Sequence, residues 1–591
     1  MTRTRLLIAA GTCALLILII VTSTGGFTLR AGPLYFAAHN WRGPLLLALI
    51  AFGSAALAGR AAVVDAATGV WRFVDTHALA LAIGLAASAA GVGIAYGTYA
   101  ASGADASGYI SEAELLSAAR IAADEPLARR VAWPNATWAF APLGYRPGAT
   151  PGELVPTYPA GLPLSIAPVR LVAGELAAYL VVPLLGALAV ICTYALGARL
   201  HSRPGGVAAA ALLVTSPVFL FQIVQPMSDV AVTAWWALAL IFALSPVPGS
   251  PLAAGAASGL AVLTRPNLAP LAAVVALVVS GWPGEHSRAR SRPQNLLAFA
   301  AGLTPAAGAL ALMQWRLYGS PFFSGYGSPG ELFTASNIAP NLRAYAARLL
   351  HGEAPALVIA AISALVLSLT PRGRGDHAPP IRRLLVPAVP VAAVLLACYL
   401  PYAVFAEWSY LRFLLPAFPL SFVLVGALLV NATMRVPPAM RGVVLLAALT
   451  LACSLNIVRA QQEQAFNLRR YESRYRAAGN YLEAALPPAA VVVAVQESGS
   501  VRYYAHVPIL RWDQLGVDID AAIAAMRAIG RHPVLLVEDW EARDLLAKFP
   551  ASAIARLDWP ARAEFGDETR VRLFDPVDRD APRPWAADRV H

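Results

Sequence analysis

HALALAIGLAASAAGVGIAYGTYAASGADASGY, residues 77–109, is the stretch that decides the fold. Residues 77–98 form one apolar run, which is long enough for a helix to cross the ~30 Å of hydrocarbon in a bilayer. The run ends in a small polar sequence that contains Asp105. An ionisable side chain beside membrane helices is a functional candidate by default. The stretch therefore predicts a membrane helix that delivers a carboxylate to one surface of the membrane.

The composition of the whole chain agrees with a membrane protein. Of the 591 residues, 58% are hydrophobic and only 13% are charged, and the mean hydropathy is +0.59. A soluble domain carries roughly 25% charged residues, so most of this chain must face lipid. Strands of a membrane barrel would be about half as long as these apolar runs and would alternate in polarity. We therefore predict an α-helical polytopic membrane protein.

Thirteen apolar segments are predicted to span the membrane. They lie at about 6–21, 44–62, 77–98, 176–198, 206–224, 229–245, 253–264, 267–283, 294–315, 355–370, 384–406, 413–433 and 441–458. The region 253–283 leaves two interpretations open, two short helices or one broken helix, because Thr264-Arg-Pro-Asn267 interrupts it. A broken helix with an arginine at the break must line protein or water rather than lipid. No signal-peptidase site follows the first segment cleanly, so we expect it to stay as an uncleaved helix.

Arginines supply almost all of the net charge of +11. They cluster in short loops between alternate apolar runs, which is the pattern of the positive-inside rule. This pattern predicts a cytoplasmic N-terminus and places the long segment 99–175 and the C-terminal tail outside. The Ala/Arg-rich usage is typical of a bacterium, so the predicted location is the inner membrane, with a periplasmic tail. No nucleic-acid-binding module is visible, and we expect no nucleic-acid partner.

Three units follow from these runs. Residues 1–75 hold N-terminal membrane helices, 76–458 form a membrane domain with a first outer loop at about 99–175, and 459–591 form a separate tail. In the outer loop, acidic residues near Ser111 predict that a helix begins there. The tail alternates predicted strands and helices, which indicates a small α/β domain with a parallel sheet. Its strands are expected at 490–495 and 533–537, and its helices at 517–530 and 540–548.

Two aspartates stand at the predicted outer ends of membrane helices. Asp105 follows the third predicted span, and Asp229 precedes the sixth within Gln225-Pro-Met-Ser-Asp229. A carboxylate in such a place can act as a general base, bind a divalent metal, or cap the N-terminus of a helix. The sequence leaves these three roles open for both residues.

Three arginines are candidates for binding phosphate at the same surface, because guanidinium matches phosphate geometry. They are Arg146, Arg265 and Arg412. The alternative for each is an interfacial arginine that reaches lipid headgroups. His351 and Glu353 are a further candidate pair for a metal, although a single His-x-Glu is as well explained by a surface loop. Carboxylate and arginine together suit group transfer from a lipid phosphate.

The chain resembles bacterial membrane glycosyltransferases of the GT-C superfamily over residues of about 75–430. The resemblance is to the family 39 group, which includes protein O-mannosyltransferases and lipid A aminoarabinose transferases. The order and topology of several motifs carry it. These motifs are Asp105-Ala-Ser-Gly-Tyr109 with Glu112-Ala-Glu114, Tyr158-Pro-Ala-Gly-Leu-Pro163, Pro217, Gln225-Pro-Met-Ser-Asp229, Leu263-Thr-Arg-Pro-Asn267 and Tyr410-Leu-Arg-Phe-Leu-Leu-Pro416.

The resemblance implies that Asp105 is the catalytic base, that Asp229 is a second acid, and that Arg265 and Arg412 lie near a lipid-phosphate pocket. The implied donor is a polyprenyl-phosphate-linked sugar, a hexose or a pentose, and the implied reaction inverts the anomeric centre. The acceptor is a lipid, a glycan or a protein. Many family members pair two adjacent acids in the first loop, whereas Ala106 follows Asp105 here.

The nearest possible acidic partners of Asp105 are therefore Glu112 and Glu114. This departure leaves metal dependence open, and a divalent metal is possible. Two other functions compete with glycosyl transfer. A polyprenyl-linked glycan polymerase or a lipid or glycan transporter would also use outer-face charges, although a transporter predicts an inverted repeat that is not visible. A membrane anchor for the tail would leave the aromatic first loop unexplained.

Overall fold

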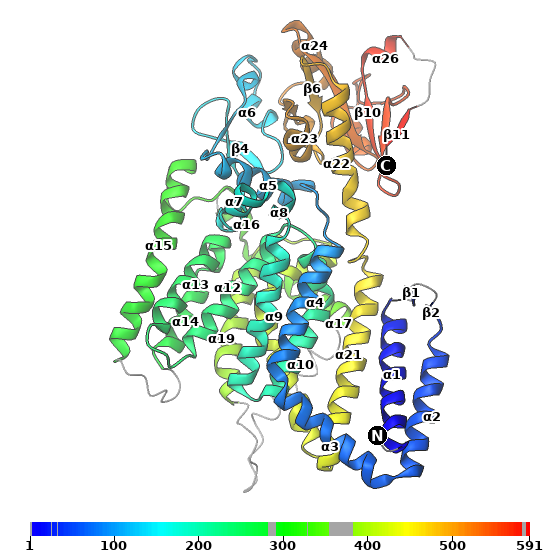
Figure 1. Ribbon diagram of the computed structural model, residues 1–591. Coiled ribbons are helices and arrows are strands. Elements are labelled where there is room, and N and C mark those ends of the chain that lie inside the picture. Colours follow the sequence, from blue (N-terminus) through cyan, green and yellow to red (C-terminus); the bar gives the residue numbers. More distant parts are fainter. Residues whose placement is uncertain are drawn as a thin grey trace.

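The computed structural model describes residues 3–24, 26–31, 34–281, 291–327, 329–353, 382–581 and 587–590. It is a bundle of helices that carries a mixed α/β domain at one end (Figure 1). We call this the α5 end of the bundle, after helix α5 (Gly103–Ser117), which lies there. The largest buried apolar cluster runs through the bundle.

The N-terminal helices stand beside the bundle. Helix α1 (Arg3–Thr24) and helix α2 (Arg42–Ala58) are joined by a hairpin of β1 (Phe27–Ala31) and β2 (Leu34–Ala38). Helix α3 (Arg60–Thr76) then crosses to the bundle at the end opposite α5 (Figure 1). The predicted span 44–62 therefore ends early, at Ala58, and the expected loop after it is a helix.

Five helical segments are long and apolar enough to cross a membrane among the described residues. They are Ala78–Ala95 (α4), Glu175–Leu200 (α8 and α9), Arg292–Tyr318 (α15), Trp408–Thr433 (η4 and α20) and Pro438–Gln462 (η5 and α21). A bent pair, α10 (Arg203–Thr215) and α11 (Pro217–Ile223), makes a sixth if it is one span, with a bend of 62° at Ser216. The membrane-type helical architecture is thus confirmed.

Five further apolar helices are shorter. They are Arg42–Ala55, Gly161–Ala173, Ser228–Ala243, Ser250–Thr264 and Arg383–Tyr399. These segments belong to α2, α7 (Gly161–Ala173), α12 (Ser228–Ala243), α13 (Ser250–Thr264) and α19 (Arg382–Tyr399). The predicted span 355–370 lies outside the described residues. The number of 13 spans, and their orientation in the membrane, stay predictions.

The region 253–283 contains two helices, which settles one open interpretation. Helix α13 ends at Thr264, a short turn η2 (Pro266–Leu268) follows, and α14 (Leu271–Val279) begins after it. Proline disfavours helical backbone at the residue before it, and Arg265 is accordingly extended, with φ −142° and ψ 90°. Helix α13 packs tightly on α15, since a Cβ on Gly255 would overlap the carbonyl oxygen of Phe299.

The segment predicted as the first outer loop, residues 99–175, folds around α5. We call it the first outer segment. A three-stranded antiparallel sheet has the order β3 (Ala123–Asp124), β5 (Glu153–Pro156), β4 (Tyr145–Pro147). Short helices η1 (Pro126–Arg129) and α6 (Ala136–Ala139) lie between β3 and β4. The prediction that a helix begins near Ser111 was wrong. Helix α5 begins eight residues earlier, at Gly103, and the acid in its first turn is Asp105.

Residues 329–352 form a second group of short helices near the α5 end of the bundle. It contains α16 (Pro329–Leu332), η3 (Ala335–Asn337) and α17 (Ile338–Gly352). Asn341 of α17 donates hydrogen bonds to the carbonyl oxygens of Leu400 and Tyr402, at 3.0 and 2.6 Å. These bonds fix the chain that leaves α19, just before η4 (Trp408–Ala417) and α20 (Phe418–Thr433).

The C-terminal tail forms a six-stranded sheet in the order β11-β9-β10-β8-β6-β7. Strands β6 (Ala490–Val493) and β8 (His532–Glu538), with helices α24 (Ile519–Ala528) and α25 (Glu541–Lys548), match the expected elements. The remaining elements are α22 (Leu468–Ala485), α23 (Ser498–Ala505), β7 (Ile509–Leu510), η6 (Trp512–Gln514), β9 (Ala563–Phe565), β10 (Val571–Phe574), α26 (Val577–Asp580) and β11 (Asp588–Val590).

The sheet is mixed, so the expectation of a parallel sheet was only half right. Strands β6, β7 and β8 are parallel, whereas β10 runs antiparallel to both β8 and β9. Successive side chains of a strand point to opposite faces, and both faces are buried. Val491 and Val493 pack into one apolar layer, and Val492 packs into the other.

The C-terminal domain docks directly on the start of α5. The backbone N–H of Ala101 donates a hydrogen bond of 2.8 Å to the Tyr504 hydroxyl. The N–H of Leu143 donates one of 3.0 Å to the Ser498 hydroxyl. Phe140 of the outer segment is fully buried in the same apolar layer as Val493. The outer segment and the tail therefore share a core, although the sequence had suggested separate units.

Candidate active site

Asp105 lies in the first turn of α5, at the end of the bundle next to the C-terminal domain. The N-cap position belongs to Ser102, which has extended backbone, so the helix-capping role left open for Asp105 is excluded. The Asp105 Oδ2 atom instead accepts a hydrogen bond of 2.8 Å from Nη2 of Arg412. Arg412 comes from η4, far away in the sequence, and this ion pair joins the first outer segment to the last third of the membrane domain.

Asp229 forms a second ion pair of the same kind. It lies in the first turn of α12, whose N-cap position is Met227, so it does not cap the helix either. Its Oδ1 atom accepts a hydrogen bond of 2.7 Å from Nη2 of Arg265. Arg265 also donates through Nη1 to the Tyr399 hydroxyl at 2.9 Å and through Nε to the Ser228 hydroxyl at 3.1 Å.

The two ion pairs belong to one cluster. Tyr109 of α5 donates a hydrogen bond of 2.8 Å to the Ser228 hydroxyl, which Arg265 also contacts. Both guanidinium groups lie over the ring of Phe413, with distances to its centroid of 5.4 Å for Arg265 and 5.5 Å for Arg412. Asp105, Asp229, Arg265 and Arg412 are therefore linked through Tyr109, Ser228 and Phe413.

The pairs differ in exposure. The Asp105 side chain is 32% exposed, whereas that of Asp229 is 0% exposed. Burial on its own would raise the pKa of the Asp105 carboxyl. The charge of Arg412 and a hydrogen bond from Tyr158 outweigh that effect, so the pKa of Asp105 lies below its usual range. The surroundings of Asp105 thus favour its ionised form, and its side chain stays about one-third exposed.

Glu112 and Glu114, the predicted acidic partners of Asp105, point to other places. Glu114 pairs with Arg170 at 2.9 Å. Glu112 is 2% exposed, lines a small cavity beside Tyr158, and its Oε2 atom has no hydrogen-bond partner among the described residues. Among the described residues, Asp105 pairs with Arg412 and with neither of these glutamates, and their catalytic partnership stays a prediction.

Arg146 has a different setting from the other two arginines. Its Nη1 atom donates to the carbonyl oxygens of Ser324 and Gly325, at 3.2 and 3.1 Å. Its guanidinium lies 5.6 Å from the ring centroids of both Trp138 and Tyr318. Arg146 therefore anchors the loop that follows α15, and a role in binding donor phosphate stays a prediction.

His351 and Glu353, the candidate metal pair, have different partners in the structure. Glu353 accepts hydrogen bonds from the Ser216 hydroxyl and from the backbone N–H of Val218, both at 2.8 Å. His351 instead contacts the carbonyl oxygen of Ala347 at 2.7 Å. Among the described residues, no group of three or more His, Cys, Asp or Glu side chains has an arrangement that could hold a metal ion.

Several residues of the cluster were not predicted. Tyr109, Ser228 and Phe413 belong to quoted motifs but received no role, and Tyr399 was read only as part of an apolar run. The Tyr399 and Phe413 rings stack with centroids 4.8 Å apart. A sequence feature could have pointed to these four residues. They are polar or aromatic and stand at helix ends, close to the charged residues.

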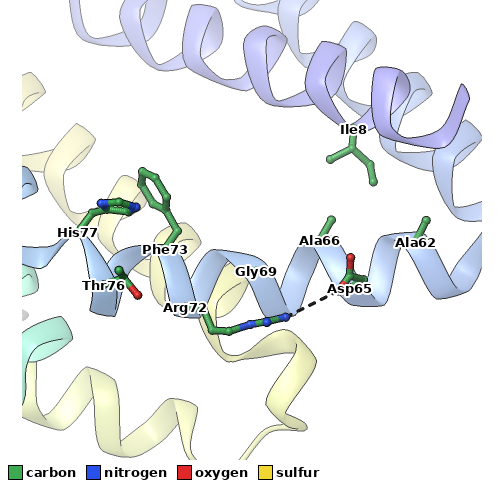
Figure 2. A pocket seen from close by; sticks show the side chains of 9 residues that line it. All are labelled: Ile8, Ala62, Asp65, Ala66, Gly69, Arg72, Phe73, Thr76 and His77. Atoms are coloured by element: carbon green, nitrogen blue, oxygen red, sulfur yellow. Dashed lines mark ion pairs between the residues drawn. The ribbon is translucent and has the colours of Figure 1, made fainter. Parts of the chain in front are cut away.

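A larger hollow lies at the opposite end of the bundle. It has a volume of about 570 Å³ and is lined by α1 and α3 residues that include Ile8, Asp65, Arg72 and His77 (Figure 2). Arg72 and Asp65 form an ion pair of 3.7 Å there, and both side chains are about two-thirds exposed. Such an exposed pair contributes little to stability, and this hollow contains none of the predicted site residues.

Comparisons with known proteins agree with this architecture. Residues 166–307 match the model of the family described as dolichyl-phosphate-mannose-protein mannosyltransferase. The matched segment contains Asp229 and Arg265 but neither Asp105 nor Arg412. No curated protein sequence matches the chain.

Two solved structures are similar to the chain at low sequence identity, and the first of them, with a TM-score above 0.5, shares the fold. ArnT from Cupriavidus metallidurans bound to undecaprenyl phosphate is 13% identical with a TM-score of 0.51, over 83% of this chain and 97% of that chain. The oligosaccharyltransferase of Archaeoglobus fulgidus in the apo form is 12% identical with a TM-score of 0.49, over 87% of this chain and 75% of that chain. The family model and the ArnT-like fold confirm the resemblance to membrane glycosyltransferases of the GT-C superfamily.

Proposed function

We propose that this chain, which has the fold of GT-C membrane glycosyltransferases, transfers a sugar from a polyprenyl-phosphate donor to an acceptor at the outer face of the bacterial inner membrane. One observation carries the proposal. Two arginines converge on one aromatic ring beside an accessible, ionised aspartate, at the end of a bundle of apolar helices. The transferred sugar would be a hexose or a pentose, and the tail that docks on α5 would be periplasmic.

The arginines supply the binding site for the donor phosphate. Guanidinium groups form charge-assisted hydrogen bonds to phosphate oxygens. Arg412 is 12% exposed and Arg265 is 13% exposed, and each already gives one Nη2 hydrogen bond to a carboxylate. A donor phosphate would compete with Asp105 for Arg412. Donor binding would then release the Asp105 carboxylate and raise its pKa, which improves it as a base at the moment when it is needed.

The chemical step needs one base. Asp105 accepts the proton of the acceptor hydroxyl, and the acceptor oxygen attacks the anomeric carbon on the face opposite the phosphate. The bond between this carbon and the phosphate oxygen breaks, and its electron pair stays on the polyprenyl phosphate. Arg265 and Arg412 stabilise the charge that develops on the leaving phosphate. This single displacement inverts the anomeric centre and needs no covalent intermediate on the protein.

Asp229 acts through Arg265 in this mechanism. Its side chain is completely buried and its Oδ1 atom is bonded to Arg265, so it does not reach an acceptor in this conformation. A fixed carboxylate orients the guanidinium and lowers the reorganisation needed when the phosphate arrives. We therefore assign Asp229 a positioning role rather than the role of a second base.

The test is sugar transfer by purified protein from a panel of labelled polyprenyl-phosphate hexoses and pentoses, with bacterial envelope lipids, glycans and proteins as acceptors. We expect transfer by the wild type, loss of transfer in Asp105→Asn, and unchanged transfer in Asp124→Asn. Asp124 is a matched control because it lies in the same outer segment, 59% exposed and paired with Arg129. Thermal stabilisation by undecaprenyl phosphate reports donor-side binding separately. A folded wild type that neither binds this lipid nor turns over any donor would contradict the proposal and favour a polymerase or transporter.

A further inference from the structure

A groove runs between the first outer segment and the end of α15. It consists of two neighbouring cavities that share Leu317, Tyr318 and Ser324. The outer one has a volume of about 370 Å³ and is lined by Arg146 and by the exposed ring of Phe323. The inner one holds about 20 Å³ and reaches Glu112 and Tyr158. The groove therefore narrows from the surface toward a single carboxyl group.

Glu112 is unusual because it is buried without a partner. Its side chain lies on α5 and lines the inner cavity, yet no arginine, lysine or histidine forms an ion pair with it among the described residues. Its Oε2 atom is sealed from solvent and unbonded, and burial holds the pKa of the carboxyl well above its usual range. A buried polar group without a partner costs roughly 1–3 kcal/mol. Such a group in a native structure requires an explanation.

The groove approaches Asp105 through Tyr158, and neither Arg265 nor Arg412 lines its two cavities. Tyr158 separates the two places: it lines the inner cavity and also donates a hydrogen bond to Asp105. Its ring contacts that of Tyr109, with centroids 5.0 Å apart. Arg412 reaches Asp105 from η4, and Arg265 bonds Asp229 of α12 and Tyr399 of α19. In a single displacement the acceptor must reach the sugar on the face opposite the phosphate, so the groove has the place required of an acceptor site.

The lining fits a carbohydrate better than a peptide. Tyr318, Phe323 and Tyr158 offer aromatic surface along the groove, and pockets for small polar ligands combine such surface with a few well-placed polar groups. A carboxyl group can exchange hydrogen bonds with a ligand hydroxyl, as donor when protonated and as acceptor in either state. Arg146, which holds the carbonyl oxygens of Ser324 and Gly325, keeps the outer wall in place.

We propose that this groove is the acceptor site and that Glu112 binds hydroxyl groups of a carbohydrate acceptor, the glycan part of a glycolipid or of a free glycan. The proposal rests on the proposed function and adds the acceptor class to it. Glu112 touches the acceptor but not the reacting atoms. Replacement of Glu112 should therefore weaken acceptor binding and leave Asp105 as the base.

The test is direct binding of simple sugars to the full-length protein in detergent, which does not depend on turnover. Saturation-transfer NMR with the methyl glycosides of glucose, galactose and mannose, each at millimolar concentration, is measured on the wild type, Glu112→Gln and Glu112→Leu. We expect at least one glycoside to bind the wild type. Binding to Glu112→Leu should be weaker by about tenfold or more, the effect of losing hydrogen bonds to an ionisable group. Glu175→Gln, an exposed acid at the start of α8, should bind as the wild type does.

Thermal unfolding distinguishes a binding role from a structural one. Glu112→Leu replaces a buried, unpartnered polar group with an apolar one, so its unfolding temperature should equal or exceed that of the wild type. Loss of sugar binding with retained stability supports the proposal. It is overturned if no glycoside binds the wild type, if Glu112→Leu binds as well as the wild type, or if the transfer assay places the label on protein side chains only. Failure of the proposed function would appear separately, as absence of undecaprenyl phosphate binding and of donor turnover.

Discussion

The two ion pairs of the cluster have nearly the same length but very different surroundings. Asp105 and Arg412 are 2.8 Å apart, and Asp229 and Arg265 are 2.7 Å apart. The Asp105 side chain is about one-third exposed, whereas that of Asp229 is fully buried. An accessible carboxylate can exchange its partner for a ligand, but a sealed carboxylate can only hold its partner in place. Under the proposed function, the accessible pair supplies the base and the buried pair holds Arg265 in place.

The change that should separate the pairs most strongly is Asp105→Asn. The amide keeps the shape of the side chain but cannot accept the acceptor proton, so transfer should fall by roughly 10²–10⁴-fold, the usual contribution of a general base. Stability should fall less than in Asp229→Asn, because the Asp105 side chain is about one-third exposed, so water can replace part of the lost interaction. Initial rates of transfer and thermal unfolding measure the two effects. A variant that retains a tenth or more of wild-type transfer would remove Asp105 from the role of base.

The sealed pair should respond in the opposite way. Asp229→Asn leaves the Arg265 guanidinium buried without its counter-charge, and breaking a buried pair costs about 3–5 kcal/mol. We expect a marked fall in the unfolding temperature together with loss of transfer. The double variant Asp229→Asn with Arg265→Gln removes both charges, so it should recover most of the stability while transfer stays low. Equal stability losses in Asp229→Asn and Asp105→Asn would contradict the division of roles.

Arg412→Gln tests the electrostatic link within the accessible pair. The pH dependence of kcat/KM reports the free enzyme's base, which must be deprotonated to act. Because Arg412 and Tyr158 hold the pKa of Asp105 below its usual range, the acid limb of the wild type should lie at lower pH than an ordinary aspartate would give. Without Arg412, burial dominates and raises the pKa of Asp105, so the limb should move to higher pH. An unmoved limb would mean that another group is the base.

The members of the cluster were predictable, because the topology brings the ends of alternate membrane helices to one surface. Asp105, Asp229, Arg265 and Arg412 were all placed at that surface from the order of apolar runs. The α/β elements of the tail were predictable for a similar reason. Their signal, short apolar strands followed by amphipathic helices, is local in the sequence.

The pairing within the cluster was not predictable from the sequence. Asp105 and Arg412 are 307 residues apart in the chain, while Asp229 and Arg265 are 36 apart, and no spacing rule chooses between these combinations. The separate setting of Arg146 depends on packing against Tyr318 of α15. The same holds for Glu112, whose burial follows from the docking of Tyr158 and of the end of α15 around it.

Ser228→Ala should have the smallest effect on transfer, because it removes only the link between the two pairs. The Ser228 hydroxyl accepts hydrogen bonds from Tyr109 at 2.8 Å and from Arg265 at 3.1 Å. Its loss should cost about 1–3 kcal/mol of stability, since both donors stay buried. Transfer should fall about tenfold or less, because Asp229 and Tyr399 still hold Arg265. The fall should appear in kcat rather than in undecaprenyl phosphate binding. The variant loses the hydrogen bond that joins α5 to α12, whereas both arginines stay in place. A loss as large as that of Asp105→Asn would show that the two pairs act as one catalytic unit and that their difference in burial does not divide their roles.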